Sequence, residues 1–574
     1  MSKFDSSSEE KSDLSVANKR NLLLLDYTKD FKSFDIINYI RLFEKTITLD
    51  RSKISQIASI SFPSASKAVD ELSAGKKAES PDKAAQVNTD GVYPVIDTPV
   101  DRTSRSEVTL NKEYGYYMGI SIGSSQLKVS LLNFCFEPHT YKEIHKMILK
   151  EEDQEPEEVQ ESEEDNKNKT PNATDEKPRF VEKGIKLQKK EHGFCIETPD
   201  NIIKLRNMLS KLVGHFVKRA EEGFPLLSIG IAFPGLINYE SKKADQCYNR
   251  NMLNGASLED LFCDDLLRRM EKLSINTFIE HNASAAATAE KHKLYESKNT
   301  IRYAMRKNSC VLFLSTGISC GVILDNELYR GASGGEIGHI QVPNLYLQKK
   351  IEMYMNTLVA PNKETTSEMA GETTGETVGE SAGEMTVEMA AKIIADMAIK
   401  KAEDKAREEE QNIIKDDIKN SLMDSCSCGL KNCLEHRIRK DVFNCTFAEY
   451  VTTHTETLYK KLENSSDDTH MLADYITYAI NSIQNTLGLE LFILTGRIAS
   501  LYRLFKLPLT VNQANRQMSF KNDGYDIVCS SYEQFAPSIG AAISAYFQSN
   551  NRRITWTDCD MSLIENDRKN DSSV

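Results

Sequence analysis

Three cysteines near residue 430 have a spacing that suits metal binding. Cys426, Cys428 and Cys433 form a Cys-x-Cys-Gly-x-x-x-Cys turn, which points three thiolates into one volume. The remaining cysteines are scattered without the spacing of a disulfide framework. Structural zinc takes four thiolate or imidazole ligands in a closed tetrahedron. The turn therefore predicts a zinc site with a fourth ligand from elsewhere; the alternative is three buried cysteines without a metal.

A second group of residues has the types and spacing of a DNA-binding motif. Residues 51–58 are expected to form one helix, and a turn at 59–61 leads to a second helix with Pro63 in its first turn. Small polar and basic side chains on the second helix suit a major groove. A plain helical hairpin is the alternative, since the polar stretch 73–80 does not resemble a wing strand. The candidate DNA contacts here are Arg51, Ser61, Ser64, Ser66 and Lys67.

Glycine-rich turns follow strand-like segments in the rest of the chain. Residues 119–134 have the form of a strand, a tight turn and a returning strand, the hairpin with which actin-like sugar kinases hold phosphate. One such hairpin is a weak signal. Four further blocks accompany it in order, at 229–237, 280–290, 315–340 and 426–435, and chance does not readily produce five.

The elements that position these residues are those of a large α/β protein. A chain of 574 residues predicts two or three domains. From Tyr114 onward, short β-type runs alternate with helical patterns, which is typical of largely buried sheets. A polar N-terminus and no apolar run of about 18 residues favour a cytoplasmic protein without a membrane partner. The net charge of −13 excludes a globally basic nucleic-acid binder, although residues 19–77 are slightly basic.

Changes in composition suggest where the domains begin and end. The acidic insertion 150–178 has too few apolar residues to offset its ordering entropy. The insertion 349–420 contains a short near-repeat and then a charged helical pattern. We expect a helix-turn-helix DNA-binding domain at 15–76, a linker at 77–112, an α/β domain at 113–549 that contains both insertions, and a polar, frayed tail at 550–574.

Taken in order, these blocks resemble the ROK family (repressor, open reading frame, kinase), and the resemblance covers most of the chain. It implies a winged-helix-like helix-turn-helix domain followed by a two-lobed actin-like (ribonuclease H-like) ATPase/sugar-kinase fold. The repressor branch of the family has an N-terminal block of Asn, basic and Leu residues, which matches residues 18–23. That match adds Lys19 and Arg20 to the candidate DNA contacts.

The resemblance also implies the fourth zinc ligand. In the family it is the His of Gly-Glu-x-Gly-His, matched here by residues 335–339 and hence by His339. The chain departs from the family in spacing, because 86 residues separate His339 from Cys426. Closing a loop costs only about 0.6 kcal/mol per doubling of its length, so a long insertion can leave both ends adjacent. Zinc would contribute on the order of 10 kcal/mol to ordering the site.

A sugar site is the next implication of the resemblance. Carboxylates and imidazoles suit vicinal hydroxyls, which present paired donors and acceptors. His339 would bind zinc through one ring nitrogen and a sugar hydroxyl through the other. For Glu336 and His339 a purely structural turn is the alternative. The residues assigned to the sugar or sugar derivative are His281, Asn282, Glu336, His339 and Glu435.

The residues that family kinases use for phosphoryl transfer are altered. Their Asp base corresponds to Asn282, and an amide cannot accept the proton. In the second phosphate turn, Ser315 and Ser319 replace glycines, and a β-carbon there restricts positive φ and crowds a phosphate. We therefore expect no catalytic residue and only vestigial phosphate turns, made by Gly123, Ser124, Ser125, Thr316, Gly317 and Gly321.

These observations predict a sugar-responsive transcriptional repressor. A dimer or higher homo-oligomer would bind operator DNA, and a sugar in the cleft would alter the spacing of its DNA-binding helices. Two rivals stay open. One is an ATP-dependent sugar kinase with an unusual base. The other is a sugar sensor that has lost DNA binding and acts through a protein partner.

Overall fold

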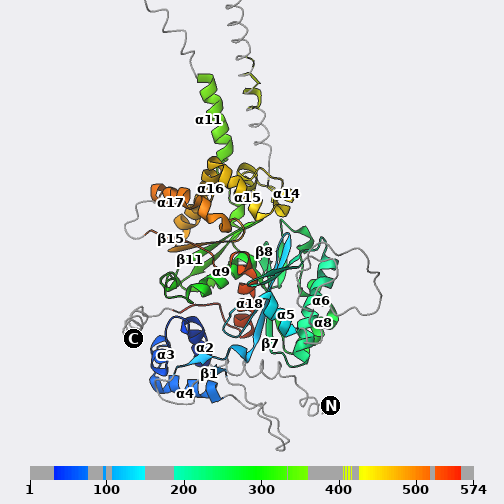
Figure 1. Ribbon diagram of the computed structural model, residues 1–574, viewed down its shortest axis with the longest axis vertical. Helices are drawn as coiled ribbons and strands as arrows, with labels where there is room; N and C mark the ends of the chain where they lie inside the picture. Colours follow the sequence, from blue (N-terminus) through cyan, green and yellow to red (C-terminus); the bar gives the residue numbers. More distant parts are fainter. Residues whose placement is uncertain are drawn as a thin grey trace, which may run out of the picture. The chain divides into compact units, whose positions relative to one another are not determined.

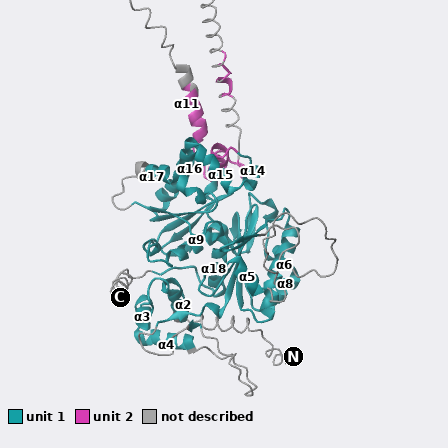
Figure 2. Cartoon of the chain, in the orientation of Figure 1, with its two compact units in different colours: residues 1–338, 445–574 teal, residues 339–444 magenta. Residues whose placement is uncertain are grey.

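The computed structural model describes residues 31–74, 95–97, 107–148, 187–331, 334–359, 426–516 and 524–557, with short pieces between 405 and 415. Lys19, Arg20, the acidic insertion 150–178 and most of 349–420 lie outside these residues. The chain divides into two units, residues 1–338 with 445–574, and residues 339–444 (Figure 2). Among the described helices, none is long and apolar enough to cross a membrane.

The first large sheet of the first unit, the β3 sheet, has the order β10-β7-β3-β4-β6-β5 (Figure 1). Its strands β10, β7 and β3 are parallel, and the others pair antiparallel. Every residue of β3 and β7 is buried, as the continuous apolar runs require. The elements are β3 (Tyr116–Ile122), β4 (Gln126–Leu132), α5 (Tyr141–Ile148), β5 (Leu187–Lys190), β6 (Gly193–Glu197), α6 (Ile202–Glu221), β7 (Leu226–Phe233), α7 (Leu258–Leu261), α8 (Asp264–Lys272) and β10 (Asn276–His281), with a small hairpin of β8 (Leu236–Asn238) and β9 (Lys243–Gln246).

The second large sheet, the β11 sheet, has the order β13-β12-β11-β14-β15. Strand β11 is antiparallel to β12 and parallel to β14. Its strands are β11 (Ser309–Leu314), β12 (Ile318–Leu324), β13 (Glu327–Tyr329), β14 (Leu491–Thr495) and β15 (Asp526–Cys529), and its helices are α10 (Ile301–Ala304), α14 (Phe447–Thr452), α15 (Thr455–Asn464), α16 (Ser466–Leu487) and α17 (Tyr502–Arg516). The second unit contains α11 (Leu345–Val359) and α13 (Leu434–Arg437). Helix α11 extends into the predicted insertion 349–420.

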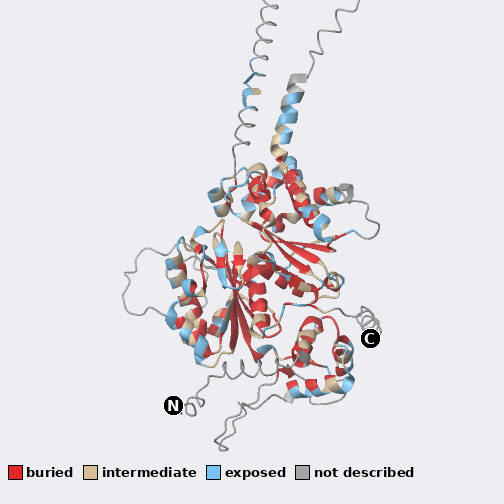
Figure 3. Cartoon of the chain, turned by 180° about the vertical axis from the view of Figure 1, so that it is seen from behind, coloured by how far each residue is buried: buried red, intermediate tan, exposed pale blue. Residues whose placement is uncertain are grey.

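Two helices rich in small residues, α9 (Asn282–Leu294) and α18 (Ala536–Ser549), join the two sheets. Helix α18 packs on the β3 sheet, α9 packs on the β11 sheet, and the helices pack against each other. This contact requires glycine, because a Cβ on Gly540 would collide with the carbonyl oxygen of Ala285. Buried residues concentrate in these sheets and the helices between them (Figure 3). The predicted α/β fold is confirmed as two lobes.

The helix-turn-helix lies where the sequence placed it. Helix α2 (Phe31–Phe43) precedes α3 (Arg51–Ile57) and α4 (Phe62–Ala74). The side chain of Asp50 caps α3 by accepting a hydrogen bond from the Lys53 amide. At the turn, Ser59 adopts a positive φ of 51°. The buried face of α4 then packs on α2 and α3.

The segment 77–112, expected to be a linker, contains a two-stranded sheet. Strands β1 (Ile96–Asp97) and β2 (Thr109–Leu110) pair antiparallel. The Val95 amide donates to the Leu72 carbonyl at 3.0 Å, so the sheet continues from the end of α4 as a wing does. A wing strand is expected directly after the second helix, in the polar stretch 73–80, but the first wing strand begins about twenty residues further along the chain.

The first part of the polar tail 550–574 is also packed rather than frayed. Trp556, the single tryptophan of the chain, is 7% exposed. Its amide donates to the Asn326 carbonyl at 2.8 Å, and the Leu328 amide donates to Ile554 at 3.0 Å. These bonds add residues 554–556 beside β13, and the buried indole supplies the apolar burial that the polar composition did not suggest.

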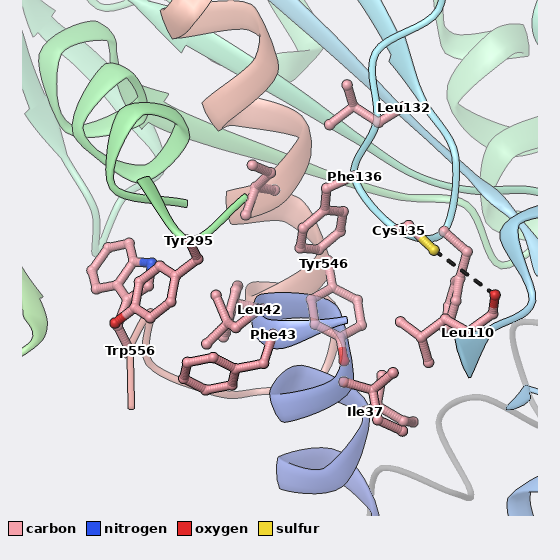
Figure 4. Close-up of a cluster of buried hydrophobic side chains, with 14 of the residues drawn as sticks. Ile37, Leu42, Phe43, Leu110, Leu132, Cys135, Phe136, Tyr295, Tyr546 and Trp556 are labelled. Carbon is pink, nitrogen blue, oxygen red and sulfur yellow. Dashed lines mark hydrogen bonds between the residues drawn. The ribbon is translucent and has the colours of Figure 1, made fainter. Parts of the chain in front are cut away.

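Helix α2 packs on the body of the first unit through aromatic side chains (Figure 4). The Arg41 guanidinium, 3% exposed, lies 3.9 Å from the ring centre of Phe136 and 4.3 Å from that of Tyr546. Its Nε donates to the Phe134 carbonyl at 3.0 Å. Phe43 makes an edge-on contact with Tyr295 at 5.4 Å between ring centres. The helical domain is thus held against the α/β body by a desolvated cation among aromatic rings.

Arg41→Ala should lower the free energy of unfolding by about 2–4 kcal/mol, because it removes a desolvated cation–π contact and leaves a cavity between rings. Denaturant titration followed by the fluorescence of Trp556, which lies in the same apolar cluster, measures the change. Arg302→Ala is the control, since Arg302 stacks on Tyr303 at the exposed surface. Equal midpoints for both variants would contradict the expectation.

Candidate metal centre and ligand site

The four predicted metal ligands come together in the second unit. The ligand atoms of His339, Cys426, Cys428 and Cys433 all lie within 4.8 Å of one another. The sulfurs of Cys428 and Cys433 are 3.4 Å apart, and Nδ1 of His339 is 3.7 Å from Sγ of Cys426. Ligands of a tetrahedral zinc, bound at about 2.0–2.3 Å, are separated by roughly 3.5–3.8 Å. The donor set and its spacing therefore fit a four-coordinate metal ion.

Short backbone pairing explains how the long connection leaves these ligands adjacent. The Val342 amide donates to the Asn432 carbonyl at 2.9 Å, and the Leu434 amide donates to Ile340 at 3.0 Å. The two chain segments that enter and leave the 86-residue connection are thus hydrogen-bonded to each other. Gly429, at a φ of +85°, donates its amide to the Cys426 carbonyl and closes the cysteine turn.

Without a cation, thiolates at these three cysteines would repel one another. Burial raises the pKa of the Cys433 thiol, and its neighbours Cys428 and Cys426 raise it further. A metal cation reverses this effect, because it binds thiolates and offsets their mutual repulsion. Cys433 also caps α13, where Glu435 is 7% exposed.

Three of the predicted sugar ligands, His281, Asn282 and Glu336, lie in the first unit. Strand β10 ends at His281, and Asn282 begins α9. The His281 ring is fully buried, with Nε2 3.2 Å from Oε1 of Glu336. This distance allows a hydrogen bond between the ring and the carboxylate. His281 therefore holds Glu336, which is the more exposed of the two, while Asn282 accepts a hydrogen bond from Ser319 at 3.4 Å.

Sequence reasoning missed a buried ion pair beside these residues. Glu280 is 1% exposed, and Arg330 Nη2 donates to its Oε2 at 2.6 Å. Arg330 Nε contacts both carboxylate oxygens, and the Tyr239 hydroxyl donates to Oε1 at 2.7 Å. Burial lowers the pKa of Arg330, but the Glu280 charge outweighs it and the net shift is upward. A charged residue within the apolar strand at 276–281 was the only signal.

The two turns that were predicted to be vestigial phosphate turns contact each other. The β3–β4 turn contains Gly123, Ser124 and Ser125, and the β11–β12 turn contains Thr316 and Gly317. Thr316 Oγ1 donates to Ser124 Oγ at 3.2 Å. Gly321 has a packing role, since a Cβ there would collide with the Ala283 carbonyl of α9.

Among the candidate DNA contacts, Arg51 does not fit its expected role. Its side chain is 5% exposed and forms an ion pair with Asp70 at 2.7 Å, so it fastens α3 to α4. Lys67 is exposed at the surface of α4, and the hydroxyls of Ser61 and Ser64 are 2.9 Å apart near its N-terminus. The sequence could not show the ion pair of Arg51 with Asp70, because the two residues lie on different helices.

These observations define a class of protein in which a helix-turn-helix with a wing packs on two actin-like lobes. The chain matches the ROK family over residues 182–546 and belongs to that family. A solved ROK family transcriptional regulator, described as a homologue of the E. coli MLC protein, aligns with 93% of this chain and all of its own, at 15% identity and a TM-score of 0.50. That likeness concerns the fold.

Relatives of known name match a shorter stretch. The xylose repressor of Bacillus spizizenii is 33% identical over 141 residues, and that of Bacillus subtilis is 31% identical over 140 residues. Each match covers 24% of this chain and 32% of the relative. The chain thus spans about a third of the length of the curated relatives that it matches.

Gly334→Ala should disturb the Glu336 loop. Gly334 has a φ of +102°, and a Cβ there would lie 2.9–3.1 Å from the buried ring of His281. We expect a loss of about 2–4 kcal/mol in unfolding free energy, from backbone strain plus overpacking. Gly255→Ala, at a φ of +73° with no atom within 4 Å of the new Cβ, should cost only the strain, about 1–2 kcal/mol. Equal losses in denaturant titration would show that the His281 contact yields freely.

Proposed function

We propose that this protein is a sugar-responsive transcriptional repressor. Its helix-turn-helix domain, residues 15–76, binds operator DNA as a homodimer, and its α/β domain, residues 113–549, binds a sugar. The observation that carries the proposal is the path of α9, which begins at the candidate sugar residues and ends beside the helix-turn-helix.

Both ends of α9 have specific contacts. At its start, Asn282 lies next to His281, whose ring contacts Glu336. Just beyond its end, Tyr295 packs edge-on against Phe43, and Glu296 forms an ion pair with Lys45 at 3.2 Å. A ligand that favours one position of α9 therefore also biases α2, which is how a sugar would alter DNA binding.

The curated relatives support xylose as the first sugar to test, because they are named xylose repressors. We assign sugar hydroxyls to Asn282 and Glu336, with His281 as the residue that holds Glu336. The assignments of His339 and Glu435 rest on the family resemblance alone. Phosphoryl transfer is not part of the proposal. Asn282 offers no base, and the Thr316–Ser124 contact lies between the turns that would hold phosphate.

We also propose that the ion held by His339, Cys426, Cys428 and Cys433 is structural zinc. Three thiolates and one imidazole are a donor set that zinc prefers, and four protein ligands leave no position for a catalytic water.

Removal of one thiolate should release the metal. Cys428→Ser should reduce bound zinc from one ion per chain to less than about 0.2 and lower the melting temperature by several degrees, because metal binding contributes to folding. Elemental analysis and thermal unfolding measure both. Cys263→Ser is the control, since Cys263 is exposed and outside the cluster. Wild-type protein that binds no zinc after refolding with the ion would refute the assignment.

DNA binding should depend on the exposed face of α4. Lys67→Ala should weaken binding about fivefold and reduce the salt dependence by about one counterion, as expected for a lost phosphate contact. Lys460→Ala is a matched control, because both lysines pair with a glutamate four residues away on an exposed helix. Fluorescence anisotropy with DNA selected from a random library, with and without D-xylose, gives the affinities.

One result would decide against the repressor. Absence of saturable DNA binding at low salt, with or without sugar, would exclude it. If sugar binding persisted in that case, the protein would be a sensor that acts through another partner.

A further inference from the structure

Within the proposed function, we infer that Arg330 and Glu280 are positioning residues for the sugar site. Their buried ion pair, with Tyr239, holds Glu336 in the orientation that binds a sugar hydroxyl. Neither residue needs to contact the sugar. The inference rests on the proposal that Glu336 binds the ligand, and it adds the residues that set the affinity of that contact.

The segment from Arg330 to Glu336 is fastened at both of its ends to two consecutive residues of β10. At the first end, Arg330 binds the Glu280 carboxylate through Nε and Nη2. At the other end, Glu336 contacts the ring of His281 at 3.2 Å. Glu280 also accepts a hydrogen bond from the His281 amide at 3.2 Å, so the two attachments are directly connected. Chain and side chains together form a closed ring.

This ring joins the two sheets. Glu280 and His281 end β10 of the β3 sheet, whereas Arg330 follows β13 of the β11 sheet. The site residues from one lobe are therefore placed relative to those from the other by two side-chain contacts. A carboxylate that is already fixed loses less rotamer freedom when it binds a hydroxyl, and the ligand affinity is higher for that reason.

The ion pair also depends on its partners being present. Glu280 is almost fully buried, and its carboxylate accepts hydrogen bonds from Arg330, Tyr239 and the His281 amide. Loss of Arg330 alone would leave a buried charge without a counterion, which is strongly destabilising. Removal of both charges avoids that penalty, but it still breaks the attachment of Arg330 to Glu280. This difference separates a positioning role from a purely structural one.

The experiment uses the full-length protein and isothermal titration with D-xylose, L-arabinose and D-glucose. The sugar that binds the wild type most tightly is then titrated into each variant. Arg330→Met and Glu336→Gln should each weaken binding at least tenfold. Because Arg330 acts through Glu336, the double variant should be no more than about twofold weaker than Glu336→Gln alone.

Glu280→Gln combined with Arg330→Met keeps the test valid if the single variant folds poorly. Its melting temperature should return toward that of the wild type, while its affinity stays at least tenfold reduced. Arg269→Met is the control, because it breaks a two-bond ion pair with Glu221 on the surface of the same unit and should leave affinity unchanged.

Affinity within twofold of the wild type for both Arg330 variants, with loss in Glu336→Gln, would overturn the positioning role and leave the sugar site intact. Additive losses in the double variant would also overturn it. Failure of the wild type to bind any of the three sugars would instead overturn the proposed sugar site, and the inference with it.

Discussion

The close packing of α9 against α18 is the contact on which both lobes depend. Gly540 makes it possible, because a Cβ there would collide with the carbonyl oxygen of Ala285. Gly119 and Gly230 in the same way allow α18 to approach the β3 sheet, and Gly321 allows α9 to approach the β11 sheet. Backbones that approach so closely leave little freedom to slide, since packed interiors resist the insertion of even one methylene group. The strand ends and turns that carry the candidate site belong to the two sheets that this contact joins.

A second consequence is that the two ends of α9 belong to one stiff element. Its first residue lies at the candidate sugar site, and the residues after its end contact Phe43 of α2 and Lys45 just beyond α2. Arg41 extends the same connection, because its guanidinium lies among two rings from the loop after β4, Phe134 and Phe136, and the ring of Tyr546 in α18. The helix-turn-helix is therefore packed on the body through contacts that a movement of α9 or α18 would disturb.

Features that depend on neighbours in the sequence were predictable, and those that depend on distant pairing were not. The most apolar strands of both sheets, the two helices of the helix-turn-helix and the cysteine turn follow from apolar periodicity, capping and spacing. The pairing of β1 with β2 and the packing of Trp556 come with bonds to Leu72 and Asn326 that no local pattern shows. For the same reason Arg51 was expected to contact DNA and Glu280 was missed, since each is bound by a partner distant in the sequence.

The proposed zinc site would explain why the chain tolerates a long insertion at this place. An eightfold increase in the length of any flexible loop adds only about 2 kcal/mol to the cost of closing it, because closure entropy grows with the logarithm of length. Zinc held by four protein ligands contributes roughly 10 kcal/mol or more. The pairing of residues 340–342 with 432–434 adds backbone hydrogen bonds at the same point. A bound zinc ion would therefore constrain the two ends of the connection strongly, and its length only weakly.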